Sequence, residues 1–429
     1  MTVADVAAPP PGIPSVSSTG SVRFVGEPRT YWRLLVRAAA LLAVTLGIYR
    51  FWFATDQRRF LWANSVIAGE TPEYSGTATE LLIGFLIAIA VLVPLNVLLF
   101  VSALSLGPAG QFASTLTFPL LFFLGQFAVY RARRYRLTRT IYRGVRCHQT
   151  GSALRYAVCA SIWWTLIVLT LGLAYPFAQS RLERFKMRHT YYGNLRGRFE
   201  GSGWRLFFRG FGLWLLVVGP LAFAVVYAIG AVDWDKASAA ADAAGNGTEF
   251  FNQIETRFPA LYIAIAVVIA AVSFSLSMAA ALFPVFQAMV LRWWISGLRL
   301  GGLTVHSQLR TGRLYGAYMR FMWYALLFST AAGIVGVIGF LTLGAVLAGL
   351  GRTDLAEIAN AAGGVVSYVV MMLGYSTIYQ GTVKFTLWRS GMESIELRGL
   401  AALDGVTAEG SASSAVGEGL ADALNVGGF

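Results

Sequence analysis

Arginine and lysine side chains, gathered in short segments between apolar runs, are the groups in this chain with the clearest chemistry. Guanidinium and ammonium groups bind phosphate and carboxylate groups, and each adds about 1 kcal/mol of attraction near an anionic membrane surface. One interpretation is therefore a set of anionic lipid-headgroup contacts; the other is that the basic residues only set the membrane orientation. The residues expected to contact headgroups are Arg58, Arg59, Arg131, Arg133, Arg134, Arg136, Arg181, Arg184 and Lys186.

The other residue types that carry chemistry form no recognisable site. The three histidines, His148, His189 and His306, show no metal-ligand spacing, and the two cysteines, Cys147 and Cys159, form no paired motif. The apolar runs hold almost no Asp or Glu, which argues against an ion-coupled carrier. We expect no metal, no cofactor and no enzymatic activity.

Composition places the chain in a membrane. Of its 429 residues 56% are hydrophobic and only 13% are charged, and the mean hydropathy is +0.62. An average soluble domain carries about 25% charged residues. The net charge of +13 comes from basic residues between apolar runs, where the positive-inside bias accounts for them, so we expect no nucleic-acid partner.

The apolar runs that must position these groups are of two kinds, which differ in the segments that flank them. Six predict membrane-crossing helices, over residues 81–106, 112–130, 206–232, 260–290, 321–350 and 365–379. Two others, 34–53 and 157–178, have basic segments on both sides, so that each either crosses the membrane or re-enters on the same side. The predicted fold class is an all-α multi-pass membrane protein: a duplicated helical bundle with six transmembrane helices, two ambiguous segments and short cytoplasmic β-strands.

Two stretches of the chain share a pattern, Thr45–Phe85 and Thr170–Phe211. Both begin with Thr-Leu-Gly, continue through aromatic and basic residues, and end near glycines before a new apolar run. The first stretch, with its Thr45-Leu46-Gly47 start and Arg59-Phe60 pair, resembles the YjgN family of bacterial inner-membrane proteins, which are built on a domain of unknown function. Arg50 and Pro176 depart from the family pattern. The resemblance implies an inner-membrane location and brings no activity or site residues.

The expected organisation follows from these patterns. It comprises a disordered tail (1–20), a first motif unit (21–110), a second unit (111–257) with an acidic external loop (233–256), a C-terminal membrane unit (258–399) and a disordered tail (400–429). Because loops rich in arginine and lysine lie on the cytoplasmic side of a membrane, we expect the termini and the basic segments in the cytoplasm. We expect transport of a small solute or handling of anionic lipid. The alternative is a non-transporting scaffold that assembles with a protein partner or with copies of itself.

Short extended pieces follow the basic segments and alternate apolar and polar residues. Since an isolated strand leaves its backbone groups unpaired, we expect these pieces to pair in one small cytoplasmic sheet. The pieces are 22–25, 73–75, 145–148, 197–200, 303–306 and 394–397.

Overall fold

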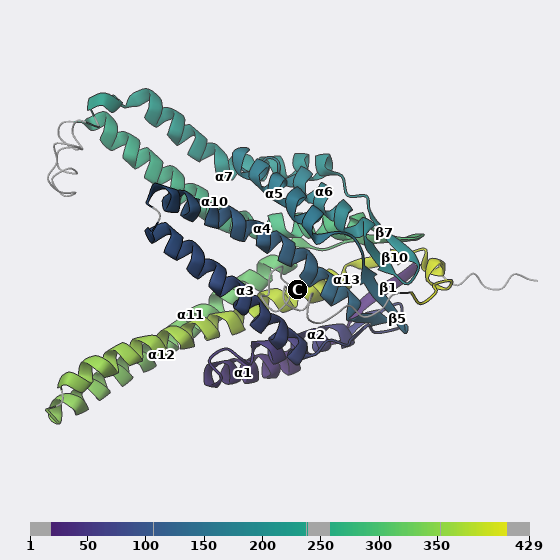
Figure 1. The fold of residues 1–429 in the computed structure, drawn as a ribbon, viewed down its shortest axis with the longest axis horizontal. Coiled ribbons are helices and arrows are strands. Elements are labelled where there is room, and N and C mark those ends of the chain that lie inside the picture. The colour runs from purple at the N-terminus through teal and green to yellow at the C-terminus, as the bar shows by residue number, and fades with distance from the viewer. Residues whose placement is uncertain (1–18, 106, 237, 239–257, 352, 410–429) are drawn as a thin grey trace, which may run out of the picture.

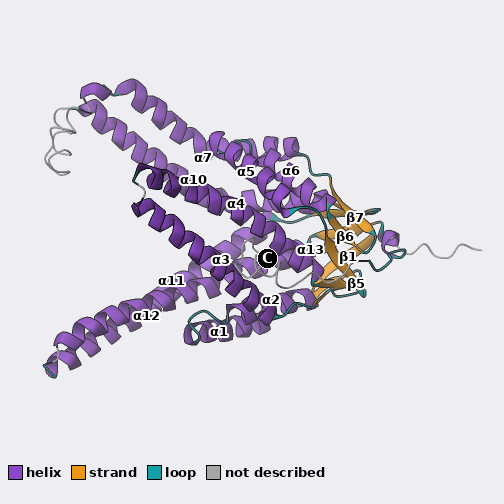
Figure 2. Ribbon diagram, in the orientation of Figure 1, coloured by secondary structure: helices purple, strands orange, loops and turns teal. Residues whose placement is uncertain are grey.

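The computed structural model describes residues 19–105, 107–236, 238, 258–351 and 353–409. A β-sheet occupies one end of the molecule, and helices extend from it in hairpins that diverge toward the other end (Figures 1 and 2). Most of the expected N-terminal tail, of the acidic loop and of the C-terminal tail lies outside the described residues, while residues 19 and 20 of the N-terminal tail belong to a strand.

The sheet has ten antiparallel strands in the order β2-β1-β10-β9-β8-β7-β6-β5-β4-β3. Its edge strands β2 and β3 follow one another in the chain, and the hydroxyl of Tyr142 on β4 donates to the carbonyl of Ile67 on β2 at 2.8 Å. The sheet therefore curls until its two edges approach each other. The strands are β1 (Thr19–Phe24), β2 (Ser65–Ile67), β3 (Glu73–Tyr74), β4 (Thr140–Tyr142), β5 (Val145–Gln149), β6 (Thr190–Tyr192), β7 (Leu195–Phe199), β8 (Leu298–Leu300), β9 (Leu303–Ser307) and β10 (Ile395–Arg398).

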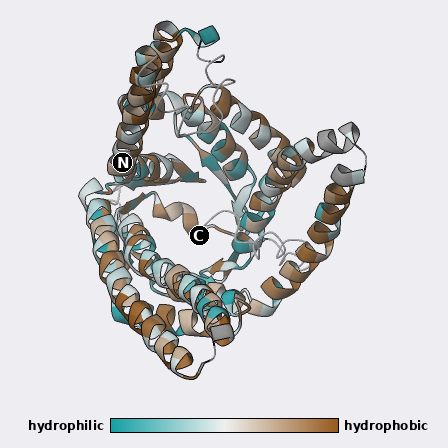
Figure 3. Ribbon diagram, turned by 90° about the vertical axis from the view of Figure 1, so that its left-hand side faces the viewer, coloured by the Kyte–Doolittle hydropathy of each residue, from teal (hydrophilic) through white to brown (hydrophobic). Residues whose placement is uncertain are grey.

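The helices connect successive pairs of strands. They are α1 (Pro28–Val44), α2 (Arg50–Ala63), α3 (Ala78–Ser105), α4 (Pro108–Thr138), α5 (Ala153–Leu169), α6 (Tyr175–Arg188), α7 (Gly203–Ala231), α10 (Pro259–Gly297), α11 (Thr311–Gly349), α12 (Thr353–Tyr379), the π-helix η1 (Gln380–Lys384), α13 (Phe385–Glu393) and the 3₁₀-helix η2 (Leu400–Leu403). Viewed from the helix tips, the helices stand around the sheet end, and apolar residues dominate the long ones (Figure 3).

One spacing recurs at five places where a strand passes into a helix. The strand ends on a buried side chain, and seven residues later the helix presents a side chain that is at most 3% exposed. Five strand residues (Phe24, Tyr74, Gln149, Phe199 and Ser307) thus precede five helix residues (Tyr31, Leu81, Tyr156, Leu206 and Leu314). Seven residues are enough for one strand end, a short turn and the first helical turn. Two of the pairs, Phe24 with Tyr31 and Phe199 with Leu206, each pack in one buried cluster.

The interior of the curled sheet is apolar. Its buried residues come from strands far apart in sequence: Val22, Tyr142, Tyr192, Leu303, Leu397 and Leu403. Leu403 belongs to η2, so residues 400–403 of the expected C-terminal tail fold onto the sheet. Farther along the tail, Thr407 donates its backbone N–H to the side chain of Asn194, between β6 and β7, at 3.3 Å.

The predicted fold class is wrong. Of the described residues 75% are helical, yet the ten strands among them form one continuous sheet, so the chain is not an all-α protein. Five of the described helices are long and apolar enough to cross a membrane: α3, α7, α10, α11 and the α12–α13 segment. The expected span 112–130 lies in α4, which is not among them. The six extended pieces do pair in one sheet, but it is larger than expected because turn residues before the predicted pieces add β2, β4, β6 and β8.

The two ambiguous runs, 34–53 and 157–178, each fold as parts of two helices that reverse at Thr-Leu-Gly. Leu46 and Leu171 both have a φ of 50°, a conformation uncommon outside glycine. The Thr45 hydroxyl donates to the Leu41 carbonyl and accepts from the Tyr49 backbone N–H, and Thr170 makes the same two bonds in its own hairpin. Both ends of each hairpin, α1/α2 and α5/α6, therefore lie on the side of the sheet.

Candidate functional site

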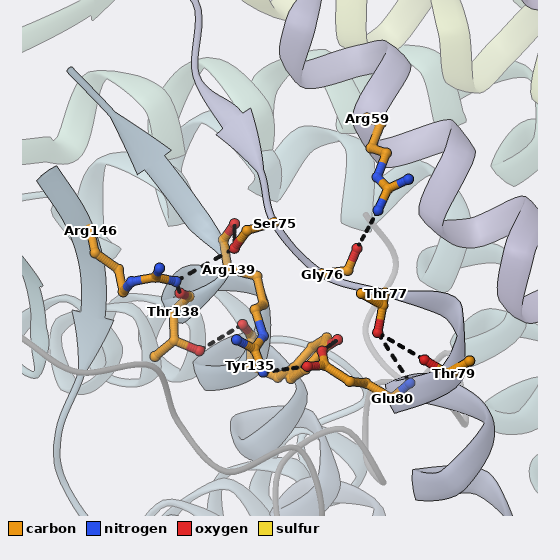
Figure 4. Close-up of polar contacts among 10 residues, drawn as sticks. All are labelled: Arg59, Ser75, Gly76, Thr77, Thr79, Glu80, Tyr135, Thr138, Arg139 and Arg146. Atoms are coloured by element: carbon orange, nitrogen blue, oxygen red, sulfur yellow. Dashed lines mark hydrogen bonds and ion pairs between the residues drawn. The ribbon is translucent and has the colours of Figure 1, made fainter. Parts of the chain in front are cut away.

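Several of the arginines expected to bind lipid hold the ends of the strands. Arg59 on α2 donates to the carbonyl of Gly76 at 3.1 Å (Figure 4), and Arg184 on α6 donates to the carbonyl of Gly201 at 3.3 Å. Arg134 on α4 donates to the carbonyl of Gly151 in the same way. In each case the helix is followed by two strands, and its arginine bonds to the residue two positions after the second strand ends.

Others of the expected residues contact neighbouring side chains. Arg58 is 6% exposed and donates to the Tyr74 hydroxyl at 3.0 Å. Arg133 donates to the Thr190 hydroxyl, and Arg131 lies 5.7 Å from the centre of the Phe127 ring. Arg136 is half-buried on α4, and Arg181 is exposed on α6. These nine residues are thus spread over three helices, and their binding of headgroups stays a prediction.

Lys186, the last of the expected residues, pairs with Glu183 in the interior, with Nζ 2.5 Å from Oε1. Burial opposes ionisation of the Glu183 carboxyl, but Lys186 and Arg133 lower its pKa below the ordinary value. The indole N–H of Trp294 on α10 donates to the second carboxylate oxygen at 3.0 Å. The Glu183 carboxylate therefore joins α6 to α10, and both of its oxygens accept from donors within the chain.

A second ion pair joins α3 to α4 next to the Arg59 contact (Figure 4). Glu80 accepts from Arg139 at 2.7 Å and from the buried Tyr135 hydroxyl at 2.6 Å. Both oxygens of the Glu80 carboxylate accept from protein donors, so this carboxylate holds the start of α3 against the end of α4.

A cavity of about 710 Å³ lies between α1, α11, η1 and α13. Pro28 and Trp32 of α1 form one wall, and Gly316 and Tyr324 of α11 form another. Charged groups enter it from two helices: Arg313 and Arg320 from α11, and Arg389 and Glu393 from α13. Three guanidinium groups and one carboxylate leave a net charge of +2, which suits an anionic ligand.

The carboxylate of Glu393 is shared between two of these arginines. It lies 2.9 Å from Nη1 of Arg313 and 2.7 Å from Nε of Arg389, and both guanidinium groups are about half exposed. Arg320 reaches across the cavity, with Nη2 3.4 Å from the Thr386 hydroxyl. The arginines are therefore held near one another while parts of their donor groups face the cavity.

The cavity wall includes the π-helix η1. A π-helical turn inserts an extra residue and is found often at functional sites. Within it Gly381 lies against Trp32, and a Cβ at this position would stand 2.5 Å from Cζ2 of the indole. Trp32 packs edge-on against Tyr324, with ring centres 6.4 Å apart. The glycine thus lets an aromatic pair form the apolar side of a charged cavity.

Comparison with known proteins identifies the family. A family profile described as "Bacterial protein of unknown function (DUF898)" matches residues 19–423. The chain belongs to the DUF898 family. This is the family of YjgN-like bacterial proteins, as the Thr45–Phe85 stretch indicates. No curated protein and no solved structure matches the chain.

The DUF898 chain thus carries a site that its basic segments alone do not reveal. Arg313 and Arg320 are seven residues apart and lie on one face of a helix, which sequence spacing can show. Arg389 comes from a helix far along the chain, and only the packing of α13 on α11 brings it to the same cavity. Among the described residues no three metal-ligating side chains gather. The charged lining of the DUF898 cavity is therefore mainly arginine, a side chain whose guanidinium suits an anion.

Proposed function

We propose that this DUF898 protein is a multi-pass protein of the bacterial inner membrane that binds a phosphate-bearing lipid headgroup in the cavity between α1, α11 and α13. The observation that carries the proposal is the presence of Arg313, Arg320 and Arg389 around one cavity of about 710 Å³. Arginine binds phosphate through two parallel hydrogen bonds, and converging arginines strengthen that binding. No catalytic step is part of the proposal.

The orientation we propose puts the sheet in the cytoplasm and the five apolar helices in the bilayer. Basic residues gather at the helix ends nearest the sheet, as the positive-inside bias requires. The first and last strands pair with each other in this sheet, so the chain enters and leaves the membrane region on the same side. The matching hydrogen bonds of Thr45 and Thr170 support an origin of the two short hairpins by duplication.

The surroundings of the cavity favour a lipid over a soluble solute. Met319, Met322 and Trp323 flank Arg320 on α11 and are each about 60% exposed. Such apolar side chains face hydrocarbon in the bilayer, while Trp32 and Tyr324 have the amphipathic rings that gather at headgroup level. A lipid bound here would place its phosphate among the arginines and its acyl chains along α11.

The experiment is a binding assay on the purified full chain. A short-chain phosphatidic acid, a phosphatidylglycerol and inorganic phosphate are titrated separately against the protein in detergent. We expect saturable binding of a lipid, with an affinity at least tenfold lower in an R313Q/R320Q variant. The control variant is R155Q/R205Q, because Arg155 and Arg205 hold the same place in α5 and α7 as Arg313 in α11 and are exposed.

The outcomes separate the sources of the phosphate. If the protein binds inorganic phosphate but neither lipid, and R313Q/R320Q abolishes that binding, the arginine site is supported and its lipid ligand is rejected. Equal affinity for the lipids in the two double variants would reject the cavity as the site, because each variant removes two positive charges.

A second candidate function is assembly with a partner or with another copy of the chain. It is favoured by one observation: no residue in the most apolar window of α11 is buried within the chain. Transmembrane helices associate through close packing, and an unpacked span is available for it. Extraction into polymer-bounded lipid particles followed by mass measurement tests this, because a single chain in every particle would reject assembly.

A further inference from the structure

We propose that the α1/α2 hairpin binds a phosphoethanolamine group, in which a phosphate and a primary ammonium belong to one molecule. A cavity of about 460 Å³ lies between the two helices and is lined by both. Among the described residues it shares no lining side chain with the cavity between α1, α11 and α13. The inference therefore does not depend on the proposed function.

Arginines on one face of α1 supply the groups that would bind the phosphate. Arg33 and Arg37 are four residues apart, so their side chains leave the helix on the same side, and both line the cavity. Both are exposed, and neither makes a hydrogen bond or an ion pair with another described residue. Arg59 enters from α2, where it also donates to the carbonyl of Gly76 at 3.1 Å. Two guanidinium groups that the described fold does not use are suited to a phosphate.

Asp56 on α2 points to a ligand that also carries a positive charge. It is half-buried and lines the same cavity as the three guanidinium groups, yet it forms no ion pair with any described residue. A carboxylate held apart from the arginines repels a phosphate alone, whereas a primary ammonium donates hydrogen bonds to it. The rings of Phe53 and Tyr49, about one and two turns before Asp56, also line the cavity. Aromatic rings attract a cation that lies over their faces, so this side of the cavity suits an ammonium.

The other short hairpin shows that these side chains are not needed for the fold. The α5/α6 hairpin follows the same plan 125 residues later, as the reversals at Thr45 and Thr170 show. Its Arg184 makes the counterpart of the Arg59 contact. The other five positions hold apolar residues or an arginine there: Val158 for Arg33, Ile162 for Arg37, Ala174 for Tyr49, Ala178 for Phe53 and Arg181 for Asp56. Such a hairpin forms without the charges and rings of the site, which favours a role for them in binding.

Site-specific photolabelling tests the proposal. Phosphatidylethanolamine with a photoactivatable acyl chain is crosslinked to the purified full chain in detergent, and labelled peptides from residues 28–63 are quantified by mass. Phosphatidylethanolamine, phosphatidylglycerol with the same acyl chains and soluble phosphoethanolamine are added separately as competitors. We expect phosphatidylethanolamine to displace the label at a concentration about threefold lower than phosphatidylglycerol, the effect of one ion pair between partly exposed groups. Displacement by soluble phosphoethanolamine at that same concentration would assign the site to a soluble ligand of this chemistry.

Asp56→Asn is the decisive variant. The neutral amide no longer attracts the ammonium, so the two lipids should displace the label equally. Glu27→Gln is the matched control and should keep the native preference, because Glu27 precedes α1, is exposed and does not line the cavity. R33V/R37I carries the residues of the α5/α6 hairpin and should reduce labelling about tenfold, since two charged contacts are lost. If this double variant does not fold, Asp56→Asn decides alone.

Three results would overturn the proposal. Equal displacement by the two lipids in the native chain would show a site for anions in general. A preference that Asp56→Asn leaves unchanged would show that this carboxylate does not contact the headgroup. Labelling of residues 28–63 at the native level in R33V/R37I would show that the lipid touches the hairpin only as surrounding solvent.

Discussion

The Glu393 carboxylate at the end of α13 lies 2.9 Å from the guanidinium of Arg313 near the start of α11. The two residues are far apart in sequence, and their ion pair closes one side of the cavity proposed to bind phosphate. Arg389, one turn before Glu393 on the same helix, binds the other carboxylate oxygen at 2.7 Å. Glu393 therefore occupies donors that a phosphate would otherwise take.

Replacing Glu393 by Gln should strengthen binding of phosphatidic acid, by several-fold. The neutral amide no longer competes for Arg313 and Arg389, and the cavity then holds three positive charges. Folding should change little, because ion pairs between partly exposed groups contribute about 0–1 kcal/mol. Lipid titration of E393Q beside the native chain measures the effect, and weaker binding in E393Q would mean that Glu393 holds the arginines in place for the ligand.

Replacing Gly381 by Ala should reduce both stability and lipid binding. A Cβ there would stand 2.5 Å from Trp32, so the indole must leave its place against Tyr324. Overpacking of this kind costs roughly 1–3 kcal/mol. Thermal unfolding in detergent and the lipid assay give the two readouts.

Gly363→Ala on α12 is the matched control for the Gly381 variant. No atom lies within 4 Å of a Cβ built at Gly363, and an exposed helical alanine is favoured over glycine by about 1 kcal/mol. Equal thermal stability of G381A and G363A would contradict the contact between Gly381 and Trp32.

Replacing Arg134 by Gln should destabilise the fold more than replacing Arg155. The Arg134 guanidinium lies 5.8 Å from the centre of the Tyr130 ring and donates to the Gly151 carbonyl, whereas Arg155 is exposed near the start of α5. A hydrogen bond from a charged donor contributes about 1.5–3 kcal/mol. The comparison is made by thermal unfolding, and a larger loss in R155Q would show that the carbonyl contact is unimportant.

The thiol of Cys147 should react slowly at neutral pH and faster as the pH rises. Burial in the sheet raises its pKa to about 11, and the thiolate is the reactive form. Below that pKa each unit of pH increases the thiolate tenfold. Alkylation of a chain carrying Cys159→Ala, followed by mass measurement, gives the rate. An alkylation rate at pH 8 equal to that of the denatured chain would show that this thiol is not buried.

The sequence by itself determined that the chain belongs in a membrane and where its extended pieces lie. A run of about 20 apolar residues indicates a membrane span, because outside the membrane it would expose a large apolar surface to water. The alternation in pieces such as 303–306 identified strands, since a period of two is a local property of the backbone. Thr45-Leu46-Gly47 likewise showed a shared motif and indicated the family.

Tertiary structure alone decided the ten-stranded sheet and the arginine cavity. Strand pairing joins β1 to β10 across almost the whole chain, and no local pattern encodes that partner. The same pairing brings α13 back to α11, so that Arg389 and Glu393 meet Arg313. Local sequence shows which residues carry charge and which face of a helix they occupy. Which charges share a cavity depends on the packing of helices that only the curled sheet brings together.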